Sequence, residues 1–120
     1  NDEELEVIGN WLDINETEQN TALQVKKHFG LQQLLVTRGA KGAWLFNKDE
    51  MINSKGIEIQ VQDTIGSGDS FLAAYLSKYL LGELPEKCLQ FASATGAYVA
   101  TQSGGTPGFT EDQIWEFTEN

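Results

Sequence analysis

The sequence is poor in cysteine and histidine, and each shortage excludes a class of protein. Its single cysteine, Cys88, has no partner within the chain for a disulfide, which favours a reducing cytoplasm as the compartment. One cysteine and one histidine are too few for most zinc sites and most nucleophile–histidine hydrolases. No apolar run approaches the ~20 residues that a membrane span needs, and the first residues lack the pattern of a signal peptide.

Positive charge is also scarce. Eight Lys and Arg residues stand against 18 Asp and Glu residues, which gives a formal net charge of −10 at pH 7. We therefore expect the chain to bind neither nucleic acid nor an anionic membrane surface. A polyphosphate bound by so acidic a protein would have to rely on backbone amides, a few cations and metal ions. With 120 residues, 40% of them hydrophobic, the chain can form one domain at most.

The periodicity of apolar residues and the positions of glycine and proline outline the secondary structure. Residues 2–9 fit the end of a helix or a frayed terminus, and residues 103–108 fit a loop. Helices are predicted at 16–29, 71–81, 86–101 and 111–117, and strands at 11–14, 34–37, 43–46, 51–53 and 57–61. The strands at 34–37, 43–46 and 51–53 are expected to be neighbours joined by tight turns. Strands that alternate with helices predict a parallel or mixed sheet with helices on both faces.

The most informative stretch is Asp63-Thr64-Ile65-Gly66-Ser67-Gly68-Asp69-Ser70-Phe71, between a predicted strand and a predicted helix. Gly66 and Gly68 permit a sharp turn and keep side chains away from an approaching ligand. The free N–H groups at a helix start favour an anion such as a phosphate. Asp69 would repel that anion, so we interpret it as the acceptor of a proton from a hydroxyl that attacks phosphorus. The alternative is a plain helix start capped by an aspartate.

These nine residues resemble the C-terminal signature of the PfkB (ribokinase-like) carbohydrate kinases, D-T-x-G-A-G-D-x-F, with serine at the usual alanine position. In that family the amides of the glycine turn form an anion hole for the transferring phosphoryl group, and the second aspartate is the base. The resemblance therefore implies an anion hole at Gly66, Ser67 and Gly68, with Asp69 as the catalytic base.

The resemblance extends over essentially all 120 residues, but it corresponds to the C-terminal part of a whole kinase. The sugar-contacting glycines and the lid strands of the family have no counterpart in this sequence. The fold that the resemblance implies is α/β, the C-terminal part of a three-layer α/β/α ribokinase-like (Rossmann-like) sandwich. Residues 1–120 would then be the nucleotide-binding and catalytic part of the kinase domain.

A second motif, Asn15-Glu16-Thr17-Glu18, resembles the N-x-x-E motif of the same family. The resemblance implies that Asn15 and Glu18 help to hold Mg²⁺ and phosphate, mostly through water. That role is chemically reasonable because protein-bound Mg²⁺ keeps several of its waters. The same residues also make a good helix N-terminus, which is the alternative.

A third motif, residues 37–42, resembles the T-x-G-x-x-G segment on the nucleotide side of these kinases. The resemblance implies that Thr37, Gly39 and Gly42 lie against the phosphates and ribose of ATP. Arg38 or Lys41 could add a cation there, or their side chains could belong to a solvated turn.

Two further sites follow from the resemblance alone. Ser93, on a predicted helix rich in small residues, falls at a position that commonly contacts the adenine base. Asp63 and Ile65, with the loop near Gly104, fall where many members bind a monovalent cation such as K⁺. The alternative for Asp63 is a carboxylate that forms a local turn.

The expected function is transfer of the γ-phosphoryl group of ATP to a sugar hydroxyl, with Mg²⁺ as cofactor. A small-molecule sugar is the expected substrate, with a fructose-like sugar favoured, and the family resemblance is compatible with a homodimer of the full-length protein. One alternative is a nucleoside or vitamin-alcohol kinase of the same superfamily. Another is a non-catalytic nucleotide-binding or assembly module. The sequence contains no P-loop motif, which excludes that class of nucleotide-binding protein.

Overall fold

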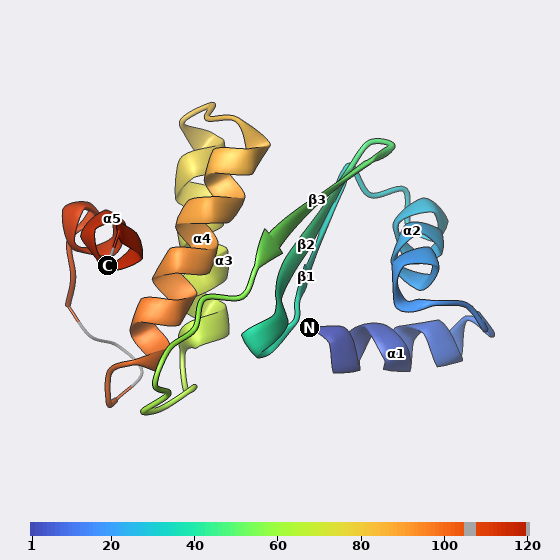
Figure 1. Cartoon of the computed structure of the whole chain (residues 1–120). Helices are drawn as coiled ribbons and strands as arrows, with labels where there is room; N and C mark the ends of the chain where they lie inside the picture. Colours follow the sequence, from blue (N-terminus) through green and yellow to red (C-terminus); the bar gives the residue numbers. More distant parts are fainter. Residues whose placement is uncertain (105–107, 120) are drawn as a thin grey trace. The chain divides into compact units, whose positions relative to one another are not determined.

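The computed structural model describes residues 1–104 and 108–119, and the chain falls into two compact units, Asn1–Lys55 and Gly56–Asn120. The part of the predicted loop at Gly105, Thr106 and Pro107 lies outside the described residues. The first unit contains α1 (Asp2–Trp11), α2 (Glu18–His28), β1 (Gln33–Thr37), the 3-10 turn η1 (Gly39–Lys41), β2 (Gly42–Asn47) and β3 (Glu50–Lys55). The second contains α3 (Ser67–Leu80), α4 (Pro85–Ala100) and α5 (Glu111–Glu119), as Figure 1 shows.

The sheet of the first unit is antiparallel, with strand order β1-β2-β3. Leu35 on β1 lies opposite Leu45 on β2, which in turn lies opposite Ile52 on β3. The strands predicted at 34–37, 43–46 and 51–53 are confirmed as neighbours joined by tight turns, and a parallel arrangement is wrong for them. Only residues 38–41 and 48–49 connect these strands, and parallel neighbours need a crossover of a dozen residues or more.

The core of the first unit lies where α1 and α2 meet one face of the sheet. Both helices lie on the same side of the strands in Figure 1. Side chains from alternate strand positions meet apolar side chains of the helices, since alternate residues share a face. The buried members of this core are Leu5, Ala22, Val25, Val36, Trp44 and Phe46. Gly9 allows α1 to approach α2 closely, because a Cβ at this position would lie 2.8 Å from Cγ2 of Thr21.

The strand predicted at residues 11–14 is wrong. Helix α1 continues to Trp11, and the N–H group of Leu12 donates to the carbonyls of Ile8 and Gly9. The chain then reverses at Asp13, whose φ is +56°. Leu12 and Ile14 pack on the core while Trp11 is 76% exposed. Alternating burial over so few residues therefore fits a helix end and a turn as well as a strand.

The helices predicted at 16–29, 71–81, 86–101 and 111–117 are confirmed, with shifts of a few residues at their ends. Gly30 follows α2 with φ +62° and Gly82 follows α3 with φ +80°, as expected of residues that end helices. Pro85 occupies the first turn of α4. None of the helices within the described ranges is long and apolar enough to cross a membrane.

The strand predicted at residues 57–61 is also wrong, because this segment forms no strand in the structure. A strand needs a neighbouring backbone for its ladder of hydrogen bonds. The only sheet among the described residues is the one formed by β1, β2 and β3. Residues 57–61 alternate in polarity as a strand does, but they have no partner strand among the described residues.

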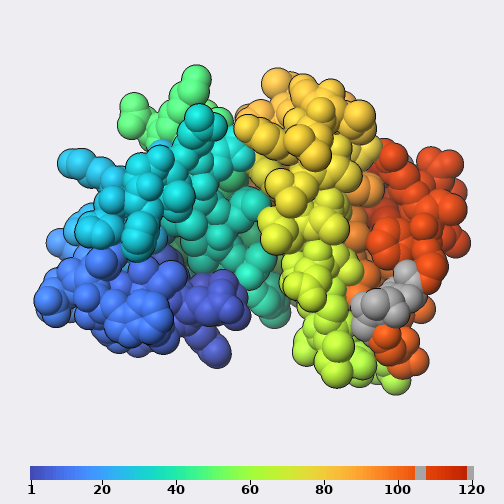
Figure 2. Space-filling model, turned by 180° about the vertical axis from the view of Figure 1, so that it is seen from behind, coloured from blue at the N-terminus to red at the C-terminus, as the bar shows by residue number. Residues whose placement is uncertain are grey.

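One face of α3 carries exposed apolar side chains. They are spaced at helical intervals and consist of Leu72, Leu76, Tyr79 and Leu80. Figure 2 shows α3, in yellow-green to yellow, along the visible surface of its unit. An apolar stripe of this kind is typical of a helix face that packs against further protein.

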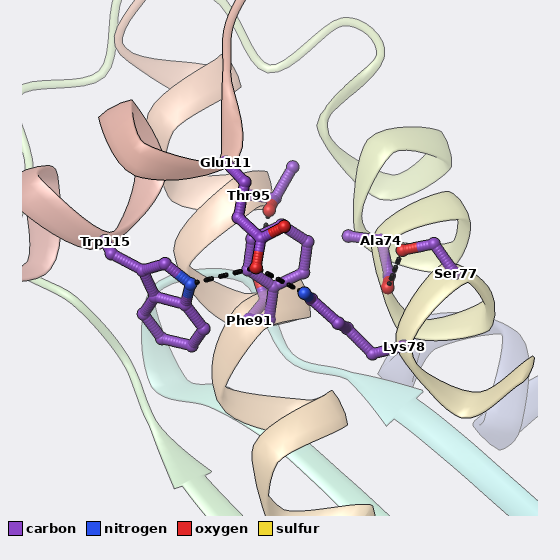
Figure 3. Close-up of polar contacts among 7 residues, drawn as sticks. All are labelled: Ala74, Ser77, Lys78, Phe91, Thr95, Glu111 and Trp115. Atoms are coloured by element: carbon purple, nitrogen blue, oxygen red, sulfur yellow. Dashed lines mark hydrogen bonds and ion pairs between the residues drawn. The ribbon is translucent and has the colours of Figure 1, made fainter. Parts of the chain in front are cut away.

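A buried lysine on α3 contacts residues of both α4 and α5 (Figure 3). The side chain of Lys78 on α3 is 8% exposed, and its Nζ donates to Oε1 of Glu111 on α5. The same Nζ lies 4.8 Å from the ring centroid of Phe91 on α4. Nε1 of Trp115 also donates to Oε1 of Glu111, at 3.4 Å. The hydrogen bond from Lys78, and after it the one from Trp115, holds the pKa of the Glu111 carboxyl below its ordinary value of 4.5.

We expect the substitution Glu111→Gln to lower the free energy of unfolding at pH 7 by about 0.5–1 kcal/mol, the upper part of the range for exposed pairs. Because folding lowers the Glu111 pKa, the ionised carboxylate stabilises the fold above pH 4.5, and this contribution is lost as the pH falls through the lower, folded-state pKa. Urea unfolding at several pH values measures both effects. Glu86→Gln, in the first turn of α4, is the matched control. If the difference in the free energy of unfolding between Glu111→Gln and the unsubstituted protein stays the same in acid, the stabilising role given to the ionised Glu111 carboxylate is contradicted.

Candidate active site

The loop that leads into α3 is held in a fixed shape by hydrogen bonds of its own. Oδ1 of Asp63 accepts from the N–H group of Ile65 at 2.9 Å, which closes a tight turn. Gly66 is the N-cap of α3, with φ +81°, a conformation that favours glycine. Both the N–H group and the hydroxyl of Ser67 donate to the carbonyl of Thr64, at 3.2 and 2.8 Å.

This loop presents backbone donors that have no acceptor among the described residues. The N–H groups of Gly66, Gly68 and Asp69 make no hydrogen bond there, whereas that of Ser70 donates to the carbonyl of Gly66 at 2.9 Å. A Cβ at Gly68 would meet no heavy atom within 4 Å, so open space faces this position. Free amides beside open space at a helix N-terminus suit a phosphate group. The loop therefore has the features of an anion-binding helix start.

Asp69 is the third residue of α3, and its side chain is exposed. It makes no hydrogen bond or ion pair with any residue in the described part of the chain. The N-cap of α3 is Gly66, and no side chain caps the helix. The structure therefore lacks the aspartate cap that was the alternative explanation for this residue. Its carboxylate is available to accept a proton from a bound group.

Helix α4 supports the loop from one side. The carbonyl of Ala100 accepts hydrogen bonds from the N–H groups of Gln62 and Asp63, at 2.8 and 3.1 Å. A Cβ at Gly96 would lie 3.2 Å from the carbonyl oxygen of Ser67 and 3.4 Å from Cβ of Phe71. Glycine at this position thus lets α4 approach the start of α3. Ser93 lies on α4 one turn before Gly96 and is half-buried.

The residues predicted for a monovalent cation form the local turn that was the alternative for Asp63. One of its carboxylate oxygens is occupied by the Ile65 N–H group, and the Ile65 side chain is exposed. Gly104 has φ +96°, and the residue after it lies outside the described part of the chain. The cation site at Asp63 and Ile65 stays a prediction.

In the first unit, Asn15 and Glu18 line a pocket of about 400 Å³. The N-cap of α2 is Thr17, whose Oγ1 accepts from the N–H group of Asn20 at 3.3 Å, so Asn15 does not cap this helix. The described residues contain no group of three or more His, Cys, Asp or Glu side chains that could hold a metal directly. One amide and one carboxylate fit Mg²⁺ held through water, because this ion retains part of its hydration shell.

The segment from Thr37 to Gly42 forms a compact turn between β1 and β2. Gly39 and Gly42 have φ values of +56° and +99°, and the N–H group of Arg38 donates to the carbonyl of Gly42 at 2.8 Å. A Cβ at Gly39 would meet no atom within 4 Å, so backbone is open to a ligand there. Lys41 is exposed, but the side chain of Arg38 is only 16% exposed. A solvated turn is therefore wrong for Arg38.

The structure thus brings the predicted site residues together in two groups. Gly66, Ser67, Gly68 and Asp69, with Asp63, Ile65 and Ser93, lie in the second unit. Asn15, Glu18, Thr37, Gly39 and Gly42 lie in the first. Their assignment to a nucleotide site stays a prediction. Sequence reasoning missed one feature of Arg38, its ion pair with the distant carboxylate of Glu18.

The chain matches the model of the pfkB family carbohydrate kinases over residues 1–112, and it therefore belongs to this family of sugar kinases. It is 35% identical to the ribokinase of Arabidopsis thaliana over 97 residues, which is 78% of this chain and 26% of that protein. The chain thus spans about a quarter of that relative. The family resemblance of the nine-residue loop is confirmed.

Solved structures define the fold as ribokinase-like. The ribokinase of Thermotoga maritima matches with a TM-score of 0.85 and 24% identity, over 98% of this chain and 40% of that one. A ribokinase II candidate of E. coli, solved in complex with ATP and Mg²⁺, matches with a TM-score of 0.79 and 25% identity, over 88% of this chain and 34% of that one. Fructokinases and a nucleoside kinase also match, so the family is defined while the acceptor is not.

Proposed function

We propose that this chain is the C-terminal nucleotide-binding and catalytic part of an ATP-dependent carbohydrate kinase. The observation that carries the proposal is the set of free amides at Gly66 and Gly68 beside the unpaired, exposed carboxylate of Asp69. Membership of the pfkB family supports it, as does the binding of ATP and Mg²⁺ by the E. coli match. The reaction would transfer the γ-phosphoryl group of ATP to a sugar hydroxyl.

The architecture proposed for the whole kinase is a three-layer α/β/α sandwich, of which this chain supplies one part. The exposed apolar face of α3, defined above, would pack against the remaining part of the kinase domain. The chain spans only 26% to 40% of the length of the relatives described above, which supports packing of α3 against a further part of the domain. An apolar stripe of that size would otherwise be costly to leave in water.

In the proposed reaction, Asp69 accepts the proton of the sugar hydroxyl as that oxygen attacks phosphorus. The amides of Gly66 and Gly68 stabilise the charge on the transferring group, since they are already oriented and need no reorganisation. The amide of Ser67 would join them after releasing its 3.2 Å hydrogen bond to Thr64. When bound, Mg²⁺ supplies neutralisation of phosphate charge, and Asn15 and Glu18 would hold it through water. Thr37, Gly39, Gly42 and Ser93 would contact the rest of the nucleotide.

The acceptor that we favour is a sugar, and within this class a fructose-like sugar. A nucleoside is the second candidate, because a nucleoside kinase of Methanocaldococcus jannaschii is 39% identical over 72 residues of this chain. Both acceptors present a hydroxyl to the same base. The residues that would distinguish them are expected in the part of the kinase that this chain does not span.

A phosphotransfer assay on the full-length protein tests the proposal. Release of ADP from ATP is measured with fructose, ribose and adenosine as separate acceptors, in the presence of Mg²⁺. We expect release that depends on one of the sugars and is absent without an acceptor. Transfer to adenosine alone would favour the nucleoside kinase. Nucleotide binding without transfer to any alcohol would favour a non-catalytic module instead.

A further inference from the structure

Arg38, the only arginine of the sequence, has an unusual environment for a loop cation. Its guanidinium carbon lies 3.8 Å from the ring centroid of Trp44. Its Nε is buried and makes no hydrogen bond within the part of the chain that the structure describes. Oε2 of Glu18, at 3.7 Å, is the carboxylate oxygen paired with it. A buried donor this close to a carboxylate points to an electrostatic role for Arg38 toward Glu18.

The arginine is held in place from both ends. Its N–H group donates to Gly42 at 2.8 Å, and its carbonyl accepts from the N–H group of Lys41 at 3.1 Å. Trp44, on which the guanidinium stacks, belongs to the buried core of the first unit. A planar guanidinium on a fixed indole ring has few alternative positions. Arg38 is therefore a rigid support in the turn that carries Gly39 and Gly42.

Glu18, by contrast, is a poorly restrained side chain in acidic surroundings. It lies at the first residue of α2, its side chain is 54% exposed, and Arg38 is its only ion-pair partner among the described residues. The pocket that it lines includes four other acidic residues, Asp2, Glu3, Glu6 and Glu16. Like charges in one pocket favour orientations of Glu18 that point away into solvent. A fixed cation at 3.7 Å opposes this.

We propose that Arg38 is a positioning residue that orients the Glu18 carboxylate and so links the nucleotide-side turn to the N-x-x-E motif. The separation of 3.7 Å is longer than a hydrogen bond, so the carboxylate is oriented while its oxygens stay available to water and cations. This inference rests on the proposed function, in which Asn15 and Glu18 serve Mg²⁺ and phosphate. It adds a residue, outside that motif, on which the Mg²⁺ requirement depends.

The test compares Arg38→Lys, Glu18→Gln and the double variant in the full-length protein. The readout is the Mg²⁺ concentration that gives half-maximal binding of a fluorescent ATP analogue, measured without turnover. Lysine keeps the positive charge but cannot stack on Trp44 as a planar guanidinium does. A change in the Mg²⁺ requirement would therefore report the orientation of Glu18 and not the net charge. We expect Arg38→Lys to raise the Mg²⁺ requirement by about fivefold, the lower end of typical couplings between sites. The double variant should show no further increase beyond Glu18→Gln, because the two residues act as one unit.

Lys27→Arg, the reverse exchange at an exposed position on α2, is the control and should leave the Mg²⁺ requirement unchanged. Urea unfolding of each variant separates a loss of stability from a change in Mg²⁺ use. Reduced stability of Arg38→Lys with an unchanged Mg²⁺ requirement would overturn this inference alone, since it would show a purely structural residue. Failure of the unsubstituted protein to bind the nucleotide at any Mg²⁺ concentration would overturn the proposed function, and this inference with it.

Discussion

The substitution Asp69→Asn is expected to lower the kcat of the full-length kinase by roughly 10²–10⁴-fold, the usual contribution of a general base. Asparagine has nearly the same shape but cannot accept the proton of the attacking hydroxyl. The Asp69 side chain is exposed and makes no hydrogen bond or ion pair with described residues, so its replacement should not disturb the fold. Binding of ATP should be retained or strengthened, because a negative charge beside the phosphates is removed.

Asp112→Asn is the matched control, since Asp112 is another exposed aspartate in the first turn of a helix, α5. Steady-state kinetics with the best acceptor and direct titration with ATP measure the two effects separately. Near-normal turnover in Asp69→Asn would reject Asp69 as the base. An equal loss in Asp112→Asn would show that the assay reports damage to the fold instead of chemistry.

The geometry of the loop that leads into α3 could be predicted from the sequence because it is set by local residues. Two glycines around one serine, with aspartates on either side, specify a turn, a helix start and an exposed carboxylate within nine residues. The structure has Gly66 at φ +81° as the N-cap, and α3 begins at Ser67. The helices were predictable for the same reason, since glycine after the last turn and Pro85 in the first turn of α4 mark their ends.

The two wrong strand predictions come from short segments whose pattern does not decide between structures. Residues 11–14 alternate in polarity, but two apolar side chains on a helix end and a turn can reach the same core. Residues 57–61 alternate over five positions, yet a strand depends on a partner that the sequence of one segment cannot supply. The antiparallel pairing, in contrast, follows from the short connections at 38–41 and 48–49, which the sequence already indicates as tight turns between neighbouring strands.

Contacts between distant residues were the least predictable part of the site. Arg38 and Glu18 are 20 positions apart, and only the fold of the first unit places Nε and Oε2 at 3.7 Å. Lys78 and Glu111 are separated by 33 positions, and neither lies in a recognisable motif. An arginine directly before a glycine, followed by a tryptophan six residues on, was a weak signal for the first contact. No comparable signal marked the second.

The loop geometry leads to a second large effect, at Gly66. Its φ of +81° is a conformation that costs an L-amino acid about 1–2 kcal/mol, so Gly66→Ala should either strain the loop or shift it. A shift would move the free amides of Gly66 and Gly68 away from the transferring phosphoryl group. Loss of a single preorganised donor lowers kcat by roughly 10²–10³-fold in comparable sites, and we expect at least the lower value. Steady-state kinetics and urea unfolding on the same preparation measure both consequences.

Gly82→Ala provides an unusually close control for this experiment. Gly82 follows the other end of the same helix, has φ +80°, and a Cβ there would meet no atom within 4 Å. The strain in the two variants should be similar, because the two φ angles are nearly equal. We therefore expect similar losses in the free energy of unfolding and a loss of kcat in Gly66→Ala alone. Equal kcat values in the two variants would show that strain at α3, and not the position of the amides, explains any loss of turnover.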